Sequence, residues 1–392
     1  MSLRQLSPHA AIGYFASGVL ARLPVAASSL ATLLLLQAAT GSYAFTGLAG
    51  AAQGLAMAAG GPAVGALADR FGQRPVAAYC CLLAAASMLA LIAAGRAGRP
   101  WMLAAAALAG AVQPQIGTLV RVRWARLLGE PARSAALGAA MAFEAAADEA
   151  SFVLGPALAG LLSGFHTPLG PIVPAALVAA LLLAAALPFT LRHGDARPAP
   201  TAHAAHSAPL PWRALSVLAG AMAALGTVFG AVQIGVIAYT AGAGHPGAAG
   251  VVYAQLGLGS MLAGIACAWL PARFPLERRY TAFAAALLAG TLLLLAGALL
   301  HALAFTVALA GAGIAPFMTT LYAYVQRLTP PQRHATALGV LAVGAPIGIA
   351  AGRALSGLAE AARHNPADAF AVAALAAALG LALTAPALGW RS

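Results

Sequence analysis

Long apolar segments separated by short polar ones repeat along the whole chain. Each is about 20 residues or longer, the length of helix that crosses a hydrocarbon core about 30 Å thick. The apolar positions do not alternate at a period of two, so a β-barrel is excluded and helices remain to satisfy the backbone in lipid. The pattern predicts an all-α integral membrane protein with twelve transmembrane helices, at residues 11–37, 44–67, 75–95, 100–122, 135–162, 170–191, 213–239, 248–270, 280–300, 303–325, 335–358 and 367–389.

One long polar segment divides the predicted helices into two groups of six. Residues 192–212 are rich in Pro, Ala and His and have no apolar period, which is typical of a flexible linker. We therefore predict helical bundles at residues 1–191 and 213–392, joined by a cytoplasmic linker. His193, His203 and His206 raise the alternative of a metal site, but their irregular spacing without acids or Cys favours a solvated loop and no metal.

Composition supports lipid as the solvent for most of the chain. Hydrophobic residues make up 62% of it and charged residues only 8%, whereas soluble proteins carry about 25% charged residues. The formal net charge is +12. The basic residues lie in short clusters between apolar runs, with no stripe of interleaved aromatics, so we expect no nucleic-acid partner.

The arginines predict the orientation in the membrane. With the N-terminus inside, sixteen of the 21 basic residues lie on the cytoplasmic side, and only Arg96, Arg99 and Arg363 lie outside. Arg22 and Arg353 fall within spans. The protein is therefore expected in the plasma (inner) membrane as a multi-pass protein with both termini cytoplasmic.

The two groups of helices resemble each other at an offset near 201 residues. LAGAVQP from Leu108 matches LAGAGIAP from Leu309, and GPALAG from Gly155 matches GRALSG from Gly352. Two further segments match in the same order: those that begin at Arg126 and Arg327, and DRFG after span 2 with ARFP after span 8. Duplicated bundles place a ligand site at their interface near the midplane, where rocking gives alternating access.

The loop between spans 2 and 3 carries the run GALADRFGQRP, which begins at Gly65. It resembles the G-x-x-x-D-R-x-G-R-R/K signature of the major facilitator superfamily, with Gln73 in place of a basic residue. The resemblance implies a cytoplasmic gate formed by Gly65, Asp69, Arg70, Gly72 and Arg74, with Asp69 facing the start of span 11. Gly65 would allow close helix approach, and Gly72 would permit a tight turn. A plain positive loop that fixes topology is the alternative.

Span 5 is similar to the antiporter signature of the same family, which ends in G-P-x-x-G-G. Here Gly155, Pro156 and Gly160 match, whereas the first glycine of the final pair is absent and Ser151 replaces an earlier glycine. This partial match favours an exporter of the drug/metabolite:proton antiporter-like branch. A proline-kinked face of small residues used for packing is nearly as good an interpretation.

Four ionisable residues fall near the middle of predicted spans, where charge is costly and usually functional. Arg22 lies in span 1; Glu144 and Asp148 share one face of span 5, and Glu149 lies about 100° away. We expect Arg22 to pair with Glu144 or Asp148, and the remaining carboxylate, beside a like charge in low dielectric, to bind a proton. The alternative is a fixed ion-pair cluster that joins two helices.

Polar candidates for a substrate cavity are few. If spans 1, 4, 7 and 10 line the pathway, as the resemblance implies, they are Gln113, Gln115, Phe229, Gln233 and Phe317. Such a cavity favours an amphipathic or uncharged organic molecule. Arg353, towards the outer end of span 11, is expected to snorkel outward rather than to attract an anionic substrate.

Together these features predict a secondary active transporter, and the favoured function is proton-coupled efflux of a small organic solute by a monomer. The proton gradient is the expected driving force, without a cofactor. An importer or uncoupled facilitator of the same fold is the alternative. A membrane-embedded enzyme or receptor is remote, because no HExxH or GxSxG occurs and no histidine lies in the middle of a span.

Overall fold

The computed structural model describes residues 12–128, 134–164, 170–194, 210–270, 274–330 and 333–387, and these residues contain helices and no strand. We call the helices of the first half of the chain the N-half. They are α1 (Ile12–Thr40), α2 (Tyr43–Phe71), α3 (Gln73–Ala97), α4 (Arg99–Ala111), α5 (Ile116–Leu128), α6 (Ser134–Ser163), α7 (Val173–Leu181), the π-helix η3 (Leu182–Ala186) and α8 (Leu187–His193).

The helices of the second half of the chain form the C-half. They are α9 (Trp212–Gly242), the 3-10 turn η4 (Pro246–Ala248), α10 (Ala249–Ala266), the 3-10 turn η5 (Cys267–Trp269), α11 (Leu276–Leu299), α12 (Leu303–Gly311), α13 (Ile314–Leu328), α14 (His334–Arg363), α15 (Ala367–Ala382) and α16 (Thr384–Ala387). Most of the predicted linker, residues 195–209, lies outside the described residues, so its boundaries stay a prediction.

Ten helical segments within the described residues are long and apolar enough to cross a membrane. Two more complete the predicted set. The helix α2 has 29 residues but is rich in Gly and Ala, which lowers its hydropathy. The helix α15 has 16 residues and is followed directly by α16. The predicted all-α membrane architecture of twelve spans is therefore confirmed.

Three predicted spans are interrupted helices, which the apolar pattern did not show. Span 4 breaks between α4 and α5 at the residues around Pro114, and span 10 breaks between α12 and α13. Span 6 passes through the π-helix η3 directly before Pro188, a place where the missing amide of proline disturbs the helical ladder. Irregular backbone at membrane depth is tolerated where it is buried in protein or lines a cavity.

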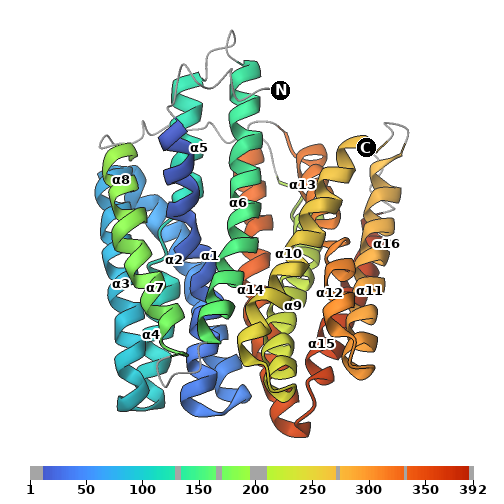
Figure 1. Cartoon of the computed structure of the whole chain (residues 1–392). Helices are drawn as coiled ribbons and strands as arrows, with labels where there is room; N and C mark the ends of the chain where they lie inside the picture. Colours follow the sequence, from blue (N-terminus) through green and yellow to red (C-terminus); the bar gives the residue numbers. More distant parts are fainter. Residues whose placement is uncertain are drawn as a thin grey trace.

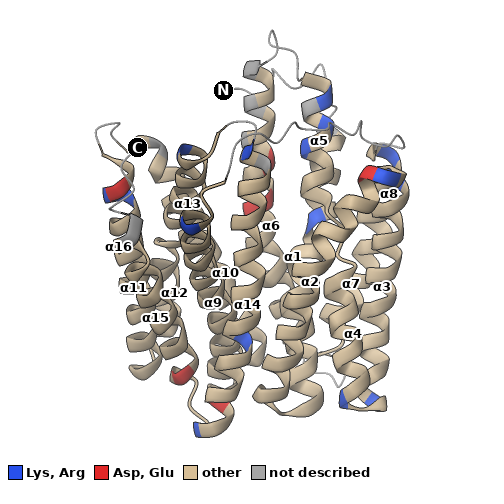
Figure 2. Ribbon diagram, turned by 180° about the vertical axis from the view of Figure 1, so that it is seen from behind, with Lys and Arg blue, Asp and Glu red and all other residues tan. Residues whose placement is uncertain are grey.

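The N-half and C-half lie side by side, and α1 begins at the same end of the bundle at which α16 ends (Figure 1). We call this the inner end, because the arginine distribution predicts that it faces the cytoplasm, and the opposite end the outer end. Charged positions gather mainly at the inner end and are few along the middle of the helices (Figure 2).

The two halves meet through glycines near the outer end. A Cβ at Gly160 of α6 would overlap the backbone of Gly250 on α10. One at Gly164, directly after α6, would lie 3.0 Å from the Cα atom of Gly247 in η4. Since lipid tails are as apolar as the side chains, helices in membranes associate through such close backbone packing. The crossing of α6 and α10 therefore depends on the absence of side chains at these positions.

The helices α2 and α14 also meet only towards the outer end. A Cβ at Gly47 would lie 3.0 Å from the Cα atom of Gly357, and one at Gly54 would lie 3.3 Å from the Cβ atom of Ala350. All the buried residues of α2 fall between Thr46 and Gly54. The inner half of α2 is therefore separated from the C-half, and the bundle is closed at the outer end.

We predict that Gly160→Leu destabilises the protein by about 1–3 kcal/mol, because the added side chain must displace the backbone of Gly250. The measurement is the thermal unfolding midpoint in detergent. Gly95→Leu is the matched control, since no heavy atom lies within 4 Å of a Cβ at Gly95. An equal loss in both variants would contradict the proposed packing.

Candidate substrate cavity and buried charge cluster

A cavity of about 500 Å³ lies between the N-half and α14, on the inner side of the glycine contacts. Its lining comes from α1, α2, the break between α4 and α5, α5, α6 and α14. The α14 wall is apolar and consists of Gly339, Ala342, Val343 and Pro346. The opposite wall carries the polar side chains Arg22, Gln113, Gln115, Thr118, Arg121, Asp148 and Ser151.

Arg22 and Glu144 form a buried ion pair beside the cavity. Arg22 Nη2 donates to Glu144 Oε2, and Trp124 Nε1 donates to Glu144 Oε1 at 2.7 Å. Arg22 Nη1 also donates to the carbonyl oxygen of Gly18 at 2.9 Å. The Glu144 side chain is only 1% exposed. Each of its oxygens has a partner and the side chain is buried behind the cavity lining, so Glu144 holds Arg22 and is out of reach of a ligand in the cavity.

Asp148 is shared between two arginines. Arg22 Nε donates to Asp148 Oδ1 at 2.7 Å, and Arg121 Nη2 donates to Asp148 Oδ2 at 2.5 Å. Sequence analysis predicts that Arg22 leaves one of the two carboxylates unpaired. This prediction is wrong, because Arg22 reaches both and Arg121 supplies a second cation. The third acid, Glu149, forms no ion pair with any of the described residues.

Sequence reasoning missed Arg121 because it placed this residue at the cytoplasmic end of an unbroken span. In the structure α5 continues to Leu128, beyond the predicted end of span 4 at residue 122, so Arg121 lies inside the helix and in the cavity wall. Gly117 makes room for its pair: a Cβ there would lie 2.9 Å from Arg121 Nη1 and 3.4 Å from Asp148 Oδ1. A span 4 extended to Leu128 would have placed Arg121 at the depth of the site.

The break between α4 and α5 also positions the two predicted glutamines in the cavity. Gln113 Nε2 donates to the carbonyl oxygen of Val25 at 3.2 Å and to Ser28 Oγ at 3.0 Å, which ties the break to α1. Gln115 Nε2 donates to the carbonyl oxygen of Gln113 at 3.4 Å. Both amides line the cavity, and that of Gln115 is held by the weaker contact.

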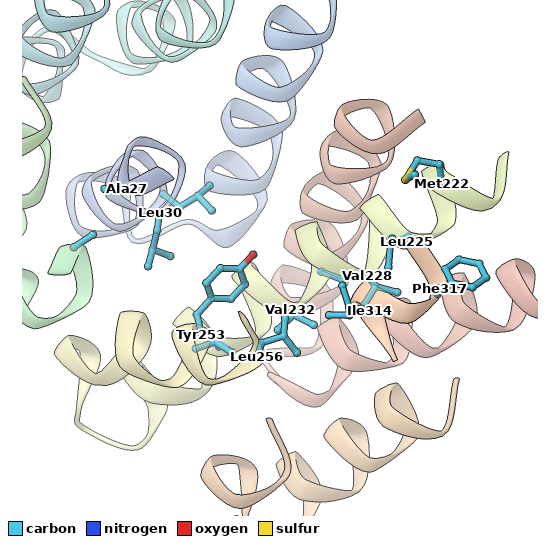
Figure 3. Close-up of a cluster of buried hydrophobic side chains, with 14 of the residues drawn as sticks. Ala27, Leu30, Met222, Leu225, Val228, Val232, Tyr253, Leu256, Ile314 and Phe317 are labelled. Carbon is cyan, nitrogen blue, oxygen red and sulfur yellow. The ribbon is translucent and has the colours of Figure 1, made fainter. Parts of the chain in front are cut away.

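The other three predicted cavity residues lie outside this cavity. Phe317 is fully buried in the C-half, where it stacks on Tyr280 at 5.7 Å between ring centroids, in the cluster that Figure 3 shows. Phe229 is partly buried against the same core. Gln233 lies nearer the outer end, next to Arg353. These residues were assigned to the cavity from the spans that carry them. A span alone does not tell which way a side chain faces or how deep in the membrane it lies.

Arg353 does not snorkel outward, so this prediction is wrong. Its side chain is 3% exposed and donates to Gln233 Oε1 at 2.9 Å, to the carbonyl oxygen of Gly50 at 2.8 Å and to Ser29 Oγ. Neutral acceptors on neighbouring helices hold the guanidinium inside the bundle.

The predicted cytoplasmic gate is apart from α14 in this conformation. Asp69, Arg70 and Arg74 are exposed, and among the described residues Asp69 has no ion pair. Arg74 Nε donates to the carbonyl oxygen of Gly194 at 3.1 Å. Gly65, expected to allow close approach, has no heavy atom within 4 Å of a Cβ. Because the cavity is open at the inner end, the partners of this segment lie out of reach.

Two glycines of the sequence motifs have a clear structural reason. Gly72 adopts φ 93° where α2 ends and α3 begins, a conformation that only glycine adopts readily, as the predicted tight turn requires. Gly155 packs on α1, where a Cβ would lie 2.8 Å from the amide nitrogen of Ala27. Pro156 and Gly160 face Gly250 of α10, so this motif joins α6 to both halves.

A closed outer end, an open inner cavity and charges at membrane depth define a membrane transporter rather than an enzyme. The sequence profile of the Major Facilitator Superfamily matches residues 10–352, and the chain belongs to this family. No curated protein matches the sequence.

Solved structures share the fold at low sequence identity. The nucleoside transporter NupG, as a D323A mutant, has a TM-score of 0.72 at 16% identity over 96% of this chain and 99% of its own. A bacterial homologue of the iron transporter ferroportin, in an inward-facing state, has a TM-score of 0.70 at 14% identity over 96% and 100%. The POT family transporter PepTSo has a TM-score of 0.68 at 12% identity over 98% of this chain and 97% of its own.

We predict that Arg22→Met costs about 3–5 kcal/mol of stability, because it leaves the Glu144 carboxylate buried without a cation. Arg327→Met is the control: Arg327 and its partner Glu277 are 35% and 36% exposed, and exposed pairs contribute about 0–1 kcal/mol. Unfolding in detergent, followed by tryptophan fluorescence, measures both. Equal losses would contradict the assigned difference between the pairs.

Proposed function

We propose that the protein exports a small uncharged or amphipathic organic solute by alternating access, in exchange for protons. The observation that carries this proposal is the position of Asp148, which lies in the cavity wall with its oxygens shared between Arg22 and Arg121. Its side chain is 25% exposed, so both a proton and a solute can reach it.

Asp148 gives proton and solute a common binding group. A proton on Asp148 removes the charge that holds Arg121. The Arg121 side chain is 39% exposed, and among the described residues its one hydrogen bond goes to this carboxylate. A solute that donates a hydrogen bond to Asp148 uses the charged form of the same oxygens. Asp148 cannot be charged and protonated at once, so it binds either the solute or a proton. If the solute-bound and protonated proteins favour opposite sides of the membrane, solute leaves as protons enter.

Glu144 has a different role in this proposal. Its buried bonds to Arg22 and Trp124 keep the Arg22 guanidinium oriented towards Asp148. Glu144 is thus a positioning residue, and Asp148 is the group that exchanges its partners. The apolar α14 wall opposite accommodates the apolar part of the solute. A single chain supplies both walls, which supports function as a monomer.

The direction of transport rests on the partial antiporter motif at Gly155, Pro156 and Gly160. These residues form contacts of α6 with α1 in its own half and with α10 in the C-half, and the contact with α10 must shift when the halves rock. We place the protein in the plasma membrane with the inner end in the cytoplasm, as the arginine distribution predicts. The cavity then takes its solute from the cytoplasm.

The exposure of Arg121 favours a second candidate function. If the solute is an anion, it binds Arg121 once Asp148 is protonated, so proton and solute travel together. This is proton-driven uptake on the same site. The direction of proton movement distinguishes the two candidates. In exchange the protons move in the direction opposite to the solute, and in co-transport they move in the same direction.

We predict that Asp148→Asn abolishes proton-driven transport and weakens solute binding, because the amide no longer titrates and mimics the protonated acid, the form that does not bind the solute. The assay uses proteoliposomes with an imposed pH gradient and a transported solute found by thermal-shift screening. Glu277→Gln, which removes an exposed acid outside the cavity, should retain full activity. Full proton-driven activity of Asp148→Asn would refute the coupling role.

We predict that Glu144→Gln lowers proton-driven transport without abolishing it. The amide oxygen still accepts a hydrogen bond, so Arg22 keeps part of its orientation while its charge is less compensated. The transport rate of this variant should fall between those of Asp148→Asn and the native protein in the same assay. A larger loss than in Asp148→Asn would reverse the assigned roles of the two acids.

A further inference from the structure

Arg353 connects the two halves of the protein near the outer end. The residue belongs to α14 in the C-half, and its Nη1 and Nη2 atoms donate to Gly50 of α2 and to Ser29 of α1 in the N-half. Its Nε atom donates to Gln233 of α9 in its own half. One side chain thus binds three helices besides its own.

The acceptors around Arg353 are held in place from both sides. Gln233 Nε2 donates to Tyr253 Oη of α10 at 3.1 Å, and more weakly to Ser29 Oγ at 3.4 Å. The ring of Tyr253 extends towards the part of the cluster where Ala27 and Leu30 of α1 lie (Figure 3). The fixed amide of Gln233 leaves the guanidinium directed at the N-half.

Glycine at position 50 lets the guanidinium reach the backbone of α2. A Cβ at Gly50 would lie 3.0 Å from Arg353 Cδ and 2.6 Å from Leu33 Cδ2, so a larger residue would displace both side chains. The planar guanidinium presents several donors in fixed directions. It can therefore bind a hydroxyl on one helix and a carbonyl on another at the same time, as it does here.

No carboxylate among the described residues is bonded to Arg353. A buried cation is costly unless its donors are satisfied, and those of Arg353 are satisfied by neutral groups from both halves. The bonds to Ser29 and Gly50 exist only while the outer ends are together. When the outer end opens, both must break and water must replace them.

We propose that Arg353 is the latch of the outer gate: its bonds to Ser29 and Gly50 hold the outer end closed and stabilise the inward-open state. The proposal rests on the alternating access of the proposed function. It concerns the balance between the two conformations, not the recognition of solute or proton. Ser29 is the part of the latch that a small substitution removes without changing any charge.

The test is a double-mutant cycle on the conformational equilibrium. Spin labels at Ala97→Cys and Leu300→Cys, both exposed at the outer ends of α3 and α11, report the outer distance in nanodiscs. The background replaces Cys80, Cys81 and Cys267 by Ala or Ser. Ser29→Ala is measured alone and together with Arg353→Met, or with Arg353→Gln if that protein does not fold. Ser28→Ala is the matched control, because Ser28 bonds to Gln113 within the N-half.

We expect Ser29→Ala to raise the ratio of outward-open to inward-open protein about ten-fold or more, since a hydrogen bond to a charged group contributes about 1.5–3 kcal/mol. In the Arg353→Met background Ser29→Ala should shift the ratio far less, because only the weak bond from Gln233 at 3.4 Å is then lost. Ser28→Ala should have no effect in either background. An unchanged ratio for Ser29→Ala, or an equal shift with and without Arg353, would overturn the latch. Neither solute nor a pH gradient is used, so such a failure leaves the proposed function standing.

Discussion

Helices in a bilayer gain no hydrophobic free energy from meeting each other, and this constraint shapes the whole molecule. Their contacts rely on backbones that approach closely at small residues. Between the two halves these contacts lie towards the outer end, where Gly160 meets Gly250 and Gly47 meets Gly357. Towards the inner end α2 and α14 lack such contacts, and the cavity lies between α14 and the N-half. One closed end and one open end thus follow from where the glycines lie.

The position of each charged side chain inside the bundle fits whether its bonds must change during transport. Glu144 and Arg22 are buried together within the N-half, where helices keep their neighbours. Asp148 and Arg121 lie in the cavity wall and are partly exposed, so their bond can exchange with a ligand or a proton. Arg353 crosses between the halves and bonds only to neutral groups. Burial and the position of the partner helix therefore distinguish three roles. The pair of Arg22 and Glu144 is fixed, the bond between Arg121 and Asp148 can exchange, and the bonds of Arg353 depend on the conformation.

The sequence predicted the fold well because membrane helices are set by length, apolarity and flanking arginines, all of which are local. It also placed Arg22, Glu144 and Asp148 near one another, since their depths follow from counting residues along each span. It failed where the end of a helix is not visible in the apolar pattern: Arg121 joined the cluster because α5 continues to Leu128, beyond the predicted end of span 4. Arg353 was misjudged because its acceptors come from three other helices, and a backbone carbonyl such as that of Gly50 has no signature in sequence.

In the proposed mechanism the two ends of the bundle open alternately around Asp148. The most direct measurement is a pair of distance distributions in nanodiscs at acidic and neutral pH, one across the outer end and one across the inner end between labels at Leu127→Cys and Gln326→Cys. The account predicts two populations in which one distance is long when the other is short, with a ratio that changes with pH in the native protein but not in Asp148→Asn. Distances that stay fixed at both ends, or that lengthen together, would contradict it.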